Sequence, residues 1–402
     1  MPINFLTITV KEDKTTDEFL KEFLHAFDKR TSNKTNLIQY EWGQLWHALL
    51  NVSLNNRGGD VAEIGSTWVQ SLAAMNSLRI FSNEEIKDIG GMENFIPSLW
   101  QNMMVANNNK VWGIPMRADV RTIYYWEDML ESAGVEDAEN AFSTFDKMNA
   151  TLEKLQKHYP TPWTTQTANL GNNAVLNITS WIRSAGGDLI TSDGKETMFA
   201  SPESLAGIHA YFELYRFMPK QGHPYDDEPI QQFCKRETAA IISGPWMLSR
   251  VRDTNPEAMV RKVKAAFLPG PSFIGGTSLI VWKHAYEVSG IINLIKSLYS
   301  TPFYAKYCSM TGVLPVTVNF SDEEYLLRNP NLPVLQQAIL GGKSINHHTL
   351  WGVIEERLSK SFGAIWAEIY SAETPPSAAE TAAIVDKHII PLARRINIML
   401  SE

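Results

Sequence analysis

The side chains most able to carry out chemistry are spaced in ways that predict no catalytic site. The nucleophile pattern Gly-x-Ser-x-Gly and the phosphate-binding pattern Gly-x-x-x-x-Gly-Lys-Ser/Thr do not occur in the chain. His347 and His348 are adjacent, so they do not share one helix face as two metal ligands four residues apart would. A carboxylate pair that cleaves glycosides is identified by geometry, so that alternative stays open. We expect a protein that is not an enzyme and holds neither cofactor nor metal.

Aromatic residues at the predicted ends of helices and strands suggest a different chemistry. A sugar has an apolar C–H face that packs on an indole ring and a hydroxyl edge that needs donors and acceptors. Any one tryptophan is more often a core residue, but we expect at least two of the set to stack on a ligand. Trp246, which follows Gly244 and Pro245, is the best placed. The boundary tryptophans are Trp42, Trp68, Trp163, Trp246 and Trp351.

A charged patch interrupts the segment VWGIPMRADVRTIYYW, residues 111–126. Pro115 fixes φ and donates no hydrogen bond, so one strand is expected to end here and another to begin. Arg117, Asp119 and Arg121 are then either a solvated turn whose charges pair with each other or polar groups that face a ligand. In the second case the arginines could bind the carboxylate of an acidic sugar. We favour a neutral sugar, because Asp119 can neutralise either arginine.

The elements that must position these residues follow from the hydrophobic pattern. Alternating strands and helices at the start predict an α/β lobe with a largely parallel sheet, whose third strand covers residues 60–64. Gly65, Ser66 and Thr67 follow that strand, at the edge where such sheets bind ligands. Later segments predict a second, mostly helical lobe around a smaller sheet. The Gly/Pro-rich residues 269–278 are expected to be a loop that returns the chain to the first lobe.

Length and charge restrict the class of protein further. A chain of 402 residues exceeds one hydrophobic core, so two lobes are expected. The net charge of −8 and the lack of a Lys/Arg cluster argue against nucleic acid as a partner. The start, MPINFLTITV, lacks a leader pattern, so the protein is either cytosolic or exported with its leader removed. Cys234 and Cys308 fit no metal spacing and are expected to be isolated buried thiols, with a single disulfide as the alternative.

Several segments together resemble the extracellular solute-binding proteins (family 1) of ATP-binding-cassette importers, in the branch that captures sugars. The resemblance implies the class II periplasmic-binding-protein-like fold, with two α/β lobes, a hinge and a ligand cleft between the lobes. Residues 1–115 and 278–320 would form the first lobe, and residues 116–277 and 321–402 the second. The segments are DVAEIGSTWV (60–69), WGIPMRADVRTIYYW (112–126), WIRSAGGDL (181–189), AAIISGPWML (239–248), GPSFIGGTSLIVWK (270–283), TGVLPV (311–316) and WGVIEERL (351–358).

The resemblance also implies what the binding residues are. Asp119 would bind sugar hydroxyls at the first hinge, and Trp246 would be the stacking aromatic, helped by Trp42 or Trp163. Thr277 stands where many relatives carry a tryptophan, and Gly65 where many carry a carboxylate, which leaves more room for the ligand. The full expected set is Trp42, Gly65, Ser66, Thr67, Arg117, Asp119, Arg121, Trp163, Trp246, Gly275, Gly276, Thr277, His347, His348 and Trp351.

The mechanism implied by the resemblance is binding without turnover. A carbohydrate would shift an open–closed equilibrium toward the closed state, which membrane permease subunits recognise. The protein would be a monomer outside the cytoplasm, either in the periplasm or lipid-anchored at the cell surface. The alternatives are a receptor for an acidic sugar, a receptor for a polyamine or peptide, and a glycoside-active enzyme. A polyamine site needs several carboxylates, whereas Asp119 stands nearly alone beside two arginines.

Overall fold

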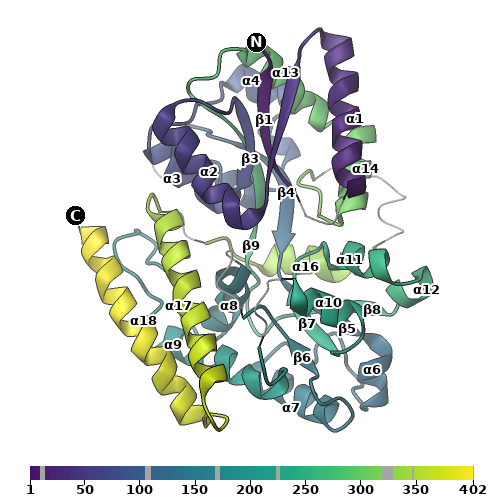
Figure 1. Ribbon diagram of the computed structural model, residues 1–402, viewed down its shortest axis with the longest axis vertical. Coiled ribbons are helices and arrows are strands. Elements are labelled where there is room, and N and C mark those ends of the chain that lie inside the picture. Colours follow the sequence, from purple (N-terminus) through teal and green to yellow (C-terminus); the bar gives the residue numbers. More distant parts are fainter. Residues whose placement is uncertain are drawn as a thin grey trace. The chain divides into compact units, whose positions relative to one another are not determined.

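The computed structural model describes residues 1–9, 14–104, 110–167, 173–222, 227–318, 329–345 and 348–401 (Figure 1). The chain divides into two compact units. Unit 1 comprises Met1–Asp119, Gly275–Arg328 and His347–Gly352, and unit 2 comprises Val120–Ile274, Asn329–Asn346 and Val353–Glu402. Each unit has a sheet of its own and is assembled from segments that lie far apart in the sequence.

Unit 1 is built on a five-stranded sheet with the strand order β2-β1-β3-β9-β4. β1 pairs in parallel with β2 and with β3, which confirms the predicted parallel pattern for the first three strands. β9 is antiparallel to β3, with Thr277 opposite Gly65. The strands are β1 (Ile3–Ile8), β2 (Thr35–Tyr40), β3 (Val61–Gly65), β4 (Ile114–Val120) and β9 (Ile274–Val281).

Helices cover both faces of this sheet, with α1 beside α14 on one side and α2 with α3 on the other (Figure 1). The apolar stripe of α1 is buried, and its Phe19 stacks on Phe303 of α14 at 5.2 Å between ring centroids. The helices of unit 1 are α1 (Lys14–Thr31), α2 (Trp42–Asn55), η1 (Ser66–Trp68), α3 (Val69–Ala74), α4 (Asn83–Ile89), η2 (Met92–Asn94), α5 (Pro97–Gln101), α13 (Val288–Leu298) and α14 (Thr301–Thr311).

Unit 2 is mostly helical around a four-stranded sheet with the order β6-β7-β5-β8. β5 is the inner strand that pairs antiparallel with both β7 and β8, with Ile123 opposite Ile242 and Ala266. β6 is parallel to β7. The strands are β5 (Thr122–Trp126), β6 (Trp163–Thr164), β7 (Ala240–Ser243) and β8 (Val263–Ala266).

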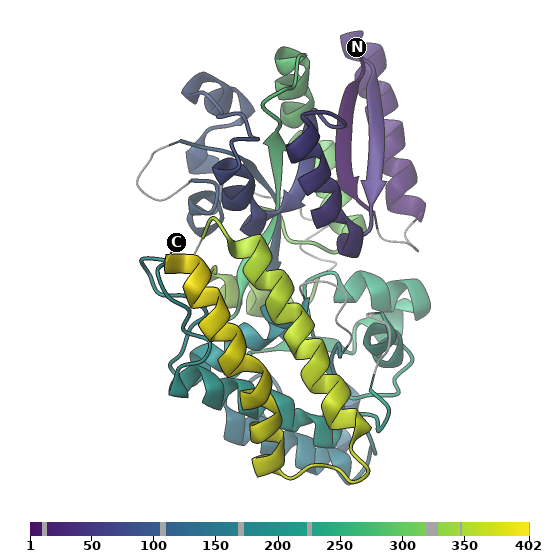
Figure 2. The ribbon, with the colours of Figure 1, turned by 60° about the vertical axis from the view of Figure 1, so that its left-hand side comes forward.

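Two long helices, α17 and α18, run side by side at the end of the chain (Figure 2). Trp366 of α17 packs on Phe212 of α9 at 4.6 Å between ring centroids, which attaches α17 to the core of unit 2. The helices of this part of the chain are α6 (Glu127–Ser132), α7 (Phe145–Gln156), α8 (Asn173–Ser184), α9 (Pro202–Phe212), η3 (Glu213–Phe217), α10 (Glu228–Cys234), α11 (Met247–Thr254), α12 (Glu257–Val260), α16 (Leu332–Gly341), α17 (Trp351–Ser371) and α18 (Ala378–Ser401).

The predicted loop at residues 269–278 is partly wrong, because β9 already begins at Ile274. Gly276 has φ +134°, a conformation that side chains with a Cβ rarely adopt. A Cβ there would lie 1.8 Å from the backbone oxygen of Arg117. These glycines therefore permit close backbone approach within the sheet and do not end it. The sequence pattern also predicts a helix at residues 322–328, which lie outside the described residues.

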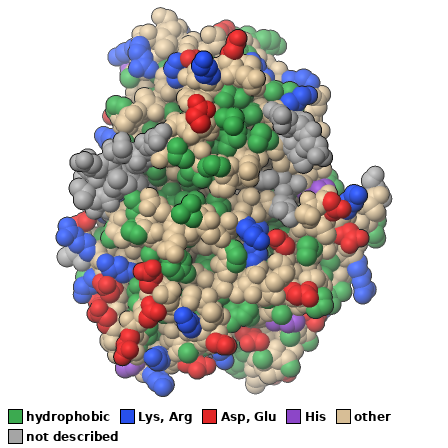
Figure 3. Space-filling model, turned by 180° about the vertical axis from the view of Figure 1, so that it is seen from behind, with side chains coloured by type: hydrophobic (Ala, Val, Ile, Leu, Met, Phe, Trp, Pro, Cys, Tyr) green, Lys and Arg blue, Asp and Glu red, His purple; other side chains and the backbone are tan. Residues whose placement is uncertain are grey.

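Cys234 and Cys308 are both buried free thiols, as the sequence predicted. Among the helices in the described part of the chain, none combines the length and apolar character needed to cross a bilayer. On the face shown in Figure 3, acidic and basic side chains are interspersed.

We predict that Gly276→Ala destabilises the protein by more than about 3 kcal/mol, because the new methyl group meets a backbone oxygen and the φ angle becomes strained. Urea unfolding of the variant measures this change in the free energy of unfolding. Gly43→Ala in α2 is the matched control, since nothing lies within 4 Å of its new Cβ. The control should be as stable as the parent or slightly more so. Equal midpoints for Gly276→Ala and the parent would contradict the close approach of β9 to β4.

Candidate functional site

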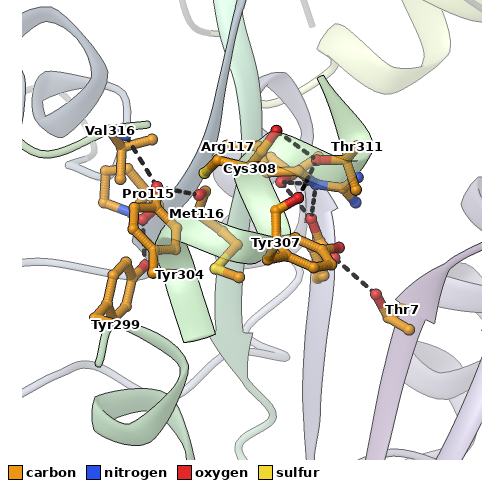
Figure 4. A network of polar contacts seen from close by, with 12 residues as sticks. Thr7, Pro115, Met116, Arg117, Tyr299, Tyr304, Tyr307, Cys308, Thr311 and Val316 are labelled. Carbon is orange, nitrogen blue, oxygen red and sulfur yellow. Dashed lines mark hydrogen bonds and ion pairs between the residues drawn. The ribbon is translucent and has the colours of Figure 1, made fainter. Parts of the chain in front are cut away.

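A buried carboxylate, that of Glu63, lies on the middle strand of the unit 1 sheet with 1% of its surface exposed. Thr7 Oγ1 of β1 donates to its Oε2 at 2.7 Å, and Thr277 Oγ1 of β9 donates to its Oε1 at 2.5 Å. Arg117 Nε of β4 donates to Oε1 as well and completes an ion pair (Figure 4). One carboxylate thus accepts hydrogen bonds from three other strands of its sheet.

The guanidinium of Arg117 is held by Glu63, by Thr277 and by the ring of Tyr307. Its Nε also lies 3.2 Å from Thr277 Oγ1, and its guanidinium carbon lies 5.7 Å from the centroid of the Tyr307 ring. Burial alone would lower the pKa of Arg117, but the charge of Glu63 raises it above the ordinary arginine value. Arg117 therefore keeps its charge inside the unit, with Glu63 as its counter-ion.

Two tyrosines fix the backbone of β4 immediately before Arg117 (Figure 4). Tyr304 donates its hydroxyl hydrogen to the Met116 oxygen at 2.8 Å and accepts from the Val316 amide at 2.9 Å. Tyr299 donates to the Pro115 oxygen. Burial raises the pKa of both hydroxyl groups well above the ordinary tyrosine value. Both tyrosines therefore stay neutral and serve as hydrogen-bond donors to the strand.

The carboxyl end of β3 brings together three of the predicted binding residues. Gly65 ends the strand, and Ser66 and Thr67 follow in the short helix η1, where both side chains are buried. Among the described residues, the buried Ser66 Oγ has no hydrogen-bond partner. A hydroxyl in this state retains its capacity to bind a ligand oxygen.

An indole ring from α2 lies beside this strand end. Trp42 is 38% exposed and meets Trp68 edge-on, with 5.7 Å between ring centroids. Trp68 in turn packs on Trp46 at 5.3 Å. A Cβ added to Gly65 would lie 3.3 Å from the Trp68 ring and 3.6 Å from the Trp42 ring. Trp42 is thus the exposed end of a row of three indoles, and Gly65 leaves room beside it.

The last predicted segment of the site packs against the buried end of this row. A Cβ on Gly352 would lie 2.4 Å from the Trp46 ring, so the start of α17 lies close to that indole. Trp351 itself is 1% exposed. His348 is half-buried, its Nδ1 accepts from the Leu350 amide at 3.0 Å, and burial lowers its pKa. His347 lies outside the described residues.

Unit 2 contains an arginine that is buried more deeply than Arg117, and it lies over a tryptophan. Arg121 is 2% exposed, and its guanidinium carbon lies 4.8 Å from the centroid of the Trp246 ring. Its Nη2 donates to Asn173 Oδ1 at 3.0 Å and its Nη1 to Asn177 Oδ1 at 3.3 Å. Both asparagines lie on α8, one turn apart. This cation–π contact joins two residues that the sequence placed separately in the site.

Further buried polar groups continue from this arginine. Asn177 Nδ2 donates to Gln166 Oε1 at 3.3 Å, and the hydroxyl groups of Thr165 and Tyr211 lie 3.0 Å apart. Burial raises the pKa of Tyr211 to about 12, although its polar neighbours, including Arg121, act to lower it. The polar groups behind Trp246 therefore form an ordered network in the interior of unit 2.

The structure brings some predicted residues together and leaves others apart. Arg117 and Thr277 contact Glu63, Gly65 lies opposite Thr277 in the sheet, and Arg121 contacts Trp246. Trp163, in β6, is 0% exposed, so the face that would stack on a sugar is covered by protein.

Sequence reasoning missed several residues of these clusters, among them Glu63, Asn173 and Asn177. Glu63 is the one charged residue of its strand, and Asn173 and Asn177 are four residues apart on one helix. These two features were the only signs in the sequence that pointed to the three residues, and neither feature identifies what the side chains contact. Within the described residues, no group of three or more His, Cys, Asp or Glu side chains could hold a metal ion.

Comparison with known proteins gives an independent assignment. The family model for bacterial extracellular solute-binding proteins matches residues 22–334. A binding protein of Brucella abortus (strain 2308) is 21% identical over 337 residues, which cover 79% of this chain and 77% of that protein. The maltooligosaccharide ABC transporter solute-binding lipoprotein of Streptococcus pneumoniae (strain R6) is 26% identical over 257 residues, covering 61% of this chain and 56% of that protein.

Solved structures match nearly the whole chain. An ABC transporter solute-binding protein of Thermotoga lettingae bound to α-D-tagatose has a TM-score of 0.81 at 18% identity and covers 98% of this chain and 99% of its own. Maltose-bound MalE3 of T. maritima has a TM-score of 0.82 at 18% identity, with 97% and 99% covered. These matches show that the chain has the two-lobe α/β fold of periplasmic binding proteins.

We predict that Glu63→Gln destabilises the protein by about 3–5 kcal/mol, because it leaves the buried charge of Arg117 without its counter-ion. The free energy of unfolding in urea is the measurement. Thr7→Val is the matched control, since it removes one neutral donor to the same carboxylate and should cost about 1 kcal/mol.

A double replacement tests the cause of this loss. Glu63→Leu with Arg117→Leu removes both charges and should recover at least half of the stability lost in Glu63→Gln. Equal stability of Glu63→Gln and the parent would show that the ion pair does not hold the strands together.

Proposed function

Because the chain belongs to the family of bacterial extracellular solute-binding proteins, we propose that it captures a neutral carbohydrate outside the cytoplasm for an ABC importer. The observation that carries the choice of a carbohydrate is the exposed indole of Trp42 beside the buried, unsatisfied hydroxyl of Ser66. An indole face next to a hydrogen-bonding hydroxyl matches the two kinds of surface that a sugar presents. The proteins of this family bind solutes and are not enzymes.

The choice of a neutral ligand rests on the two arginines. Arg117 is paired with Glu63, and Arg121 lies over Trp246 with its terminal nitrogens donating to asparagines. A ligand carboxylate would have to displace these internal partners to bind either guanidinium. The sequence suggested that Asp119 can neutralise either arginine. For Arg117 the neutralising acid is Glu63, which has the same consequence for the ligand.

Similar proteins also support this choice of ligand class. The names of the relatives refer to maltooligosaccharide, α-D-tagatose and maltose, which are all uncharged sugars. Another solved structure of this fold, from Listeria monocytogenes, is a complex with cycloalternan, with a TM-score of 0.78 at 15% identity. These ligands belong to those proteins, and they make uncharged mono- and oligosaccharides the first compounds to test here.

We assign the predicted site residues to three roles. Trp42 and Trp246 would stack on sugar rings. Hydroxyl binding would fall to Ser66 and Thr67 at the end of β3 and to Asp119. Trp163 and Trp351 are almost completely buried, so their proposed role is to support the residues that contact the ligand. The remaining members of the proposed site are Gly65, Arg117, Arg121, Gly275, Gly276, Thr277 and His348.

The mechanism in this proposal is capture followed by delivery. The two units are the ligand-binding lobes, and the lobe boundaries predicted from the sequence, 1–115 plus 278–320 and 116–277 plus 321–402, stay a prediction. Sugar binding shifts the equilibrium between conformations of the protein toward the one that the membrane subunits of the importer would recognise. The protein acts as a monomer in this scheme, in the periplasm or lipid-anchored at the cell surface.

We predict that isothermal titration calorimetry detects binding of at least one of maltose, maltotriose and D-tagatose, and that Trp246→Ala weakens this binding. The expected loss is about 1–3 kcal/mol, the usual cost of removing a stacking aromatic. Tyr286→Ala is the control, because Tyr286 is 78% exposed in unit 1 and belongs to no proposed site. It should bind the sugar as the parent does.

Two further ligands separate the alternatives in the same experiment. Glucuronic acid tests an acidic sugar, and putrescine tests a polyamine. Binding of putrescine without binding of any sugar would overturn the proposal, and binding of glucuronic acid alone would overturn the choice of a neutral ligand.

A further inference from the structure

We propose that Arg121 is a positioning residue that holds the indole ring of Trp246 ready for the sugar and makes no contact with the ligand itself. This inference rests on the proposed function, in which Trp246 stacks on a sugar ring. It assigns to Arg121 a role different from the carboxylate binding that its charge alone suggests.

The first step of the argument is the burial of Arg121. Only 2% of the residue is exposed, although an arginine side chain is long enough to reach water from most positions. Its Nη2 and Nη1 donate to Asn173 and Asn177 of α8. Since its surface is covered and its terminal nitrogens have partners, Arg121 is placed to act on other protein groups.

The second step is the orientation of the guanidinium. Asn173 begins α8 and Asn177 lies one turn later, so the helix presents two amide oxygens to one planar group. Asn177 is itself fixed, because it is completely buried and its Nδ2 donates to Gln166 Oε1 at 3.3 Å. Two acceptors on one helix, one of them fixed, restrict the plane of a guanidinium, whose donors have a rigid geometry. Arg121 is thereby held in one orientation.

The third step is the contact with Trp246. The guanidinium carbon lies 4.8 Å from the centroid of the ring, within the range of a cation–π interaction. Gly244, two residues earlier in the chain, also lies against this indole ring, since a Cβ at Gly244 would lie 2.1 Å from a ring carbon. Trp246 precedes α11 and is half-buried. Arg121 therefore occupies one face of the ring and leaves at most the other face for a ligand.

Holding the ring in advance has a measurable consequence for affinity. A tryptophan that is free to change rotamer must be ordered when the sugar binds, and that ordering reduces the affinity about three- to tenfold. Arg121 removes this loss by ordering the ring before binding. Its effect should be the same for every sugar that stacks on Trp246, because it acts through the ring and not through a ligand charge.

The test is a double-mutant cycle between Arg121 and Trp246, measured by isothermal titration with whichever of maltose, maltotriose and D-tagatose the parent binds. Arg121→Met should weaken binding three- to tenfold in the parent. In the Trp246→Ala background, the same change should alter the dissociation constant less than twofold. An undiminished loss in that background would overturn the proposal, because Arg121 would then act on the ligand directly.

Arg183→Met is the matched control for removing a buried arginine from this region of the fold. Arg183 lies on α8 as well, is 8% exposed, and donates to the backbone oxygens of Lys343 and Ser344. It has no place in the proposed site, so its replacement should leave the affinity unchanged. Should Arg121→Met fail to fold, Asn173→Ala provides a milder change that frees only Nη2, with an expected loss of about two- to threefold.

A second measurement is independent of any ligand. In protein labelled with 5-fluorotryptophan, the ¹⁹F resonance of Trp246 is identified as the one that is lost in Trp246→Phe. Arg121→Met should shift or broaden this resonance, and Arg183→Met should leave it unchanged. An unaltered resonance in Arg121→Met would overturn the proposal. If this resonance moves but none of the sugars binds the parent, the positioning role stands and the proposed function fails.

Discussion

The ion pair between Glu63 and Arg117 is the interaction on which the architecture of unit 1 depends. A carboxylate taken out of water is costly unless charged and polar partners surround it, and here the partners come from β1, β4 and β9. Arg117 and Thr277 lie two residues from the points where the chain leaves unit 1 and returns to it. The same acid therefore fastens both connecting strands, and it sets the register that places Thr277 opposite Gly65.

Arg117 and Arg121 illustrate how charge is used in this protein. Neither guanidinium is surrounded by water, and each is tied to groups of its own unit. Their positive charges serve the scaffold, so in the proposed site recognition of the ligand would fall to aromatic rings, to hydroxyl groups and to Asp119. Such a surface would discriminate between sugars by shape and by the positions of hydroxyl groups, since each unmatched buried polar group weakens binding.

Much of the fold could be predicted from the sequence, because the alternation of strands and helices is local information. The parallel order of the first three strands and the mostly helical second unit followed from it. The role of Glu63 could not be predicted, since its partners Arg117 and Thr277 are 54 and 214 residues away in the chain. Gly275 and Gly276 suggested a loop, although both lie in β9. Gly276 is required by the close approach of the Arg117 backbone, and this tertiary contact could not be predicted from the sequence.

The same limit applies to the site residues. Trp163 looked like a boundary aromatic, but it lies in β6, which pairs with β7, and its side chain is completely buried. The stacking of Arg121 on Trp246 joins residues from distant segments, and no local pattern announces it. Residue type and sequence context identified candidate binding residues. Which side chains those residues contact is decided by tertiary packing, which the sequence does not display.

The position of β9 in its sheet also bears on how the chain is made. β9 lies between β3 and β4, yet it is synthesised only after the whole of Val120–Ile274. At the usual rate of about 5–20 residues per second, this delay lasts roughly ten to thirty seconds. Until then the facing edges of β3 and β4 have no strand to join them, and the first unit cannot close. The sheet of unit 1 is therefore completed only after most of unit 2 has been synthesised.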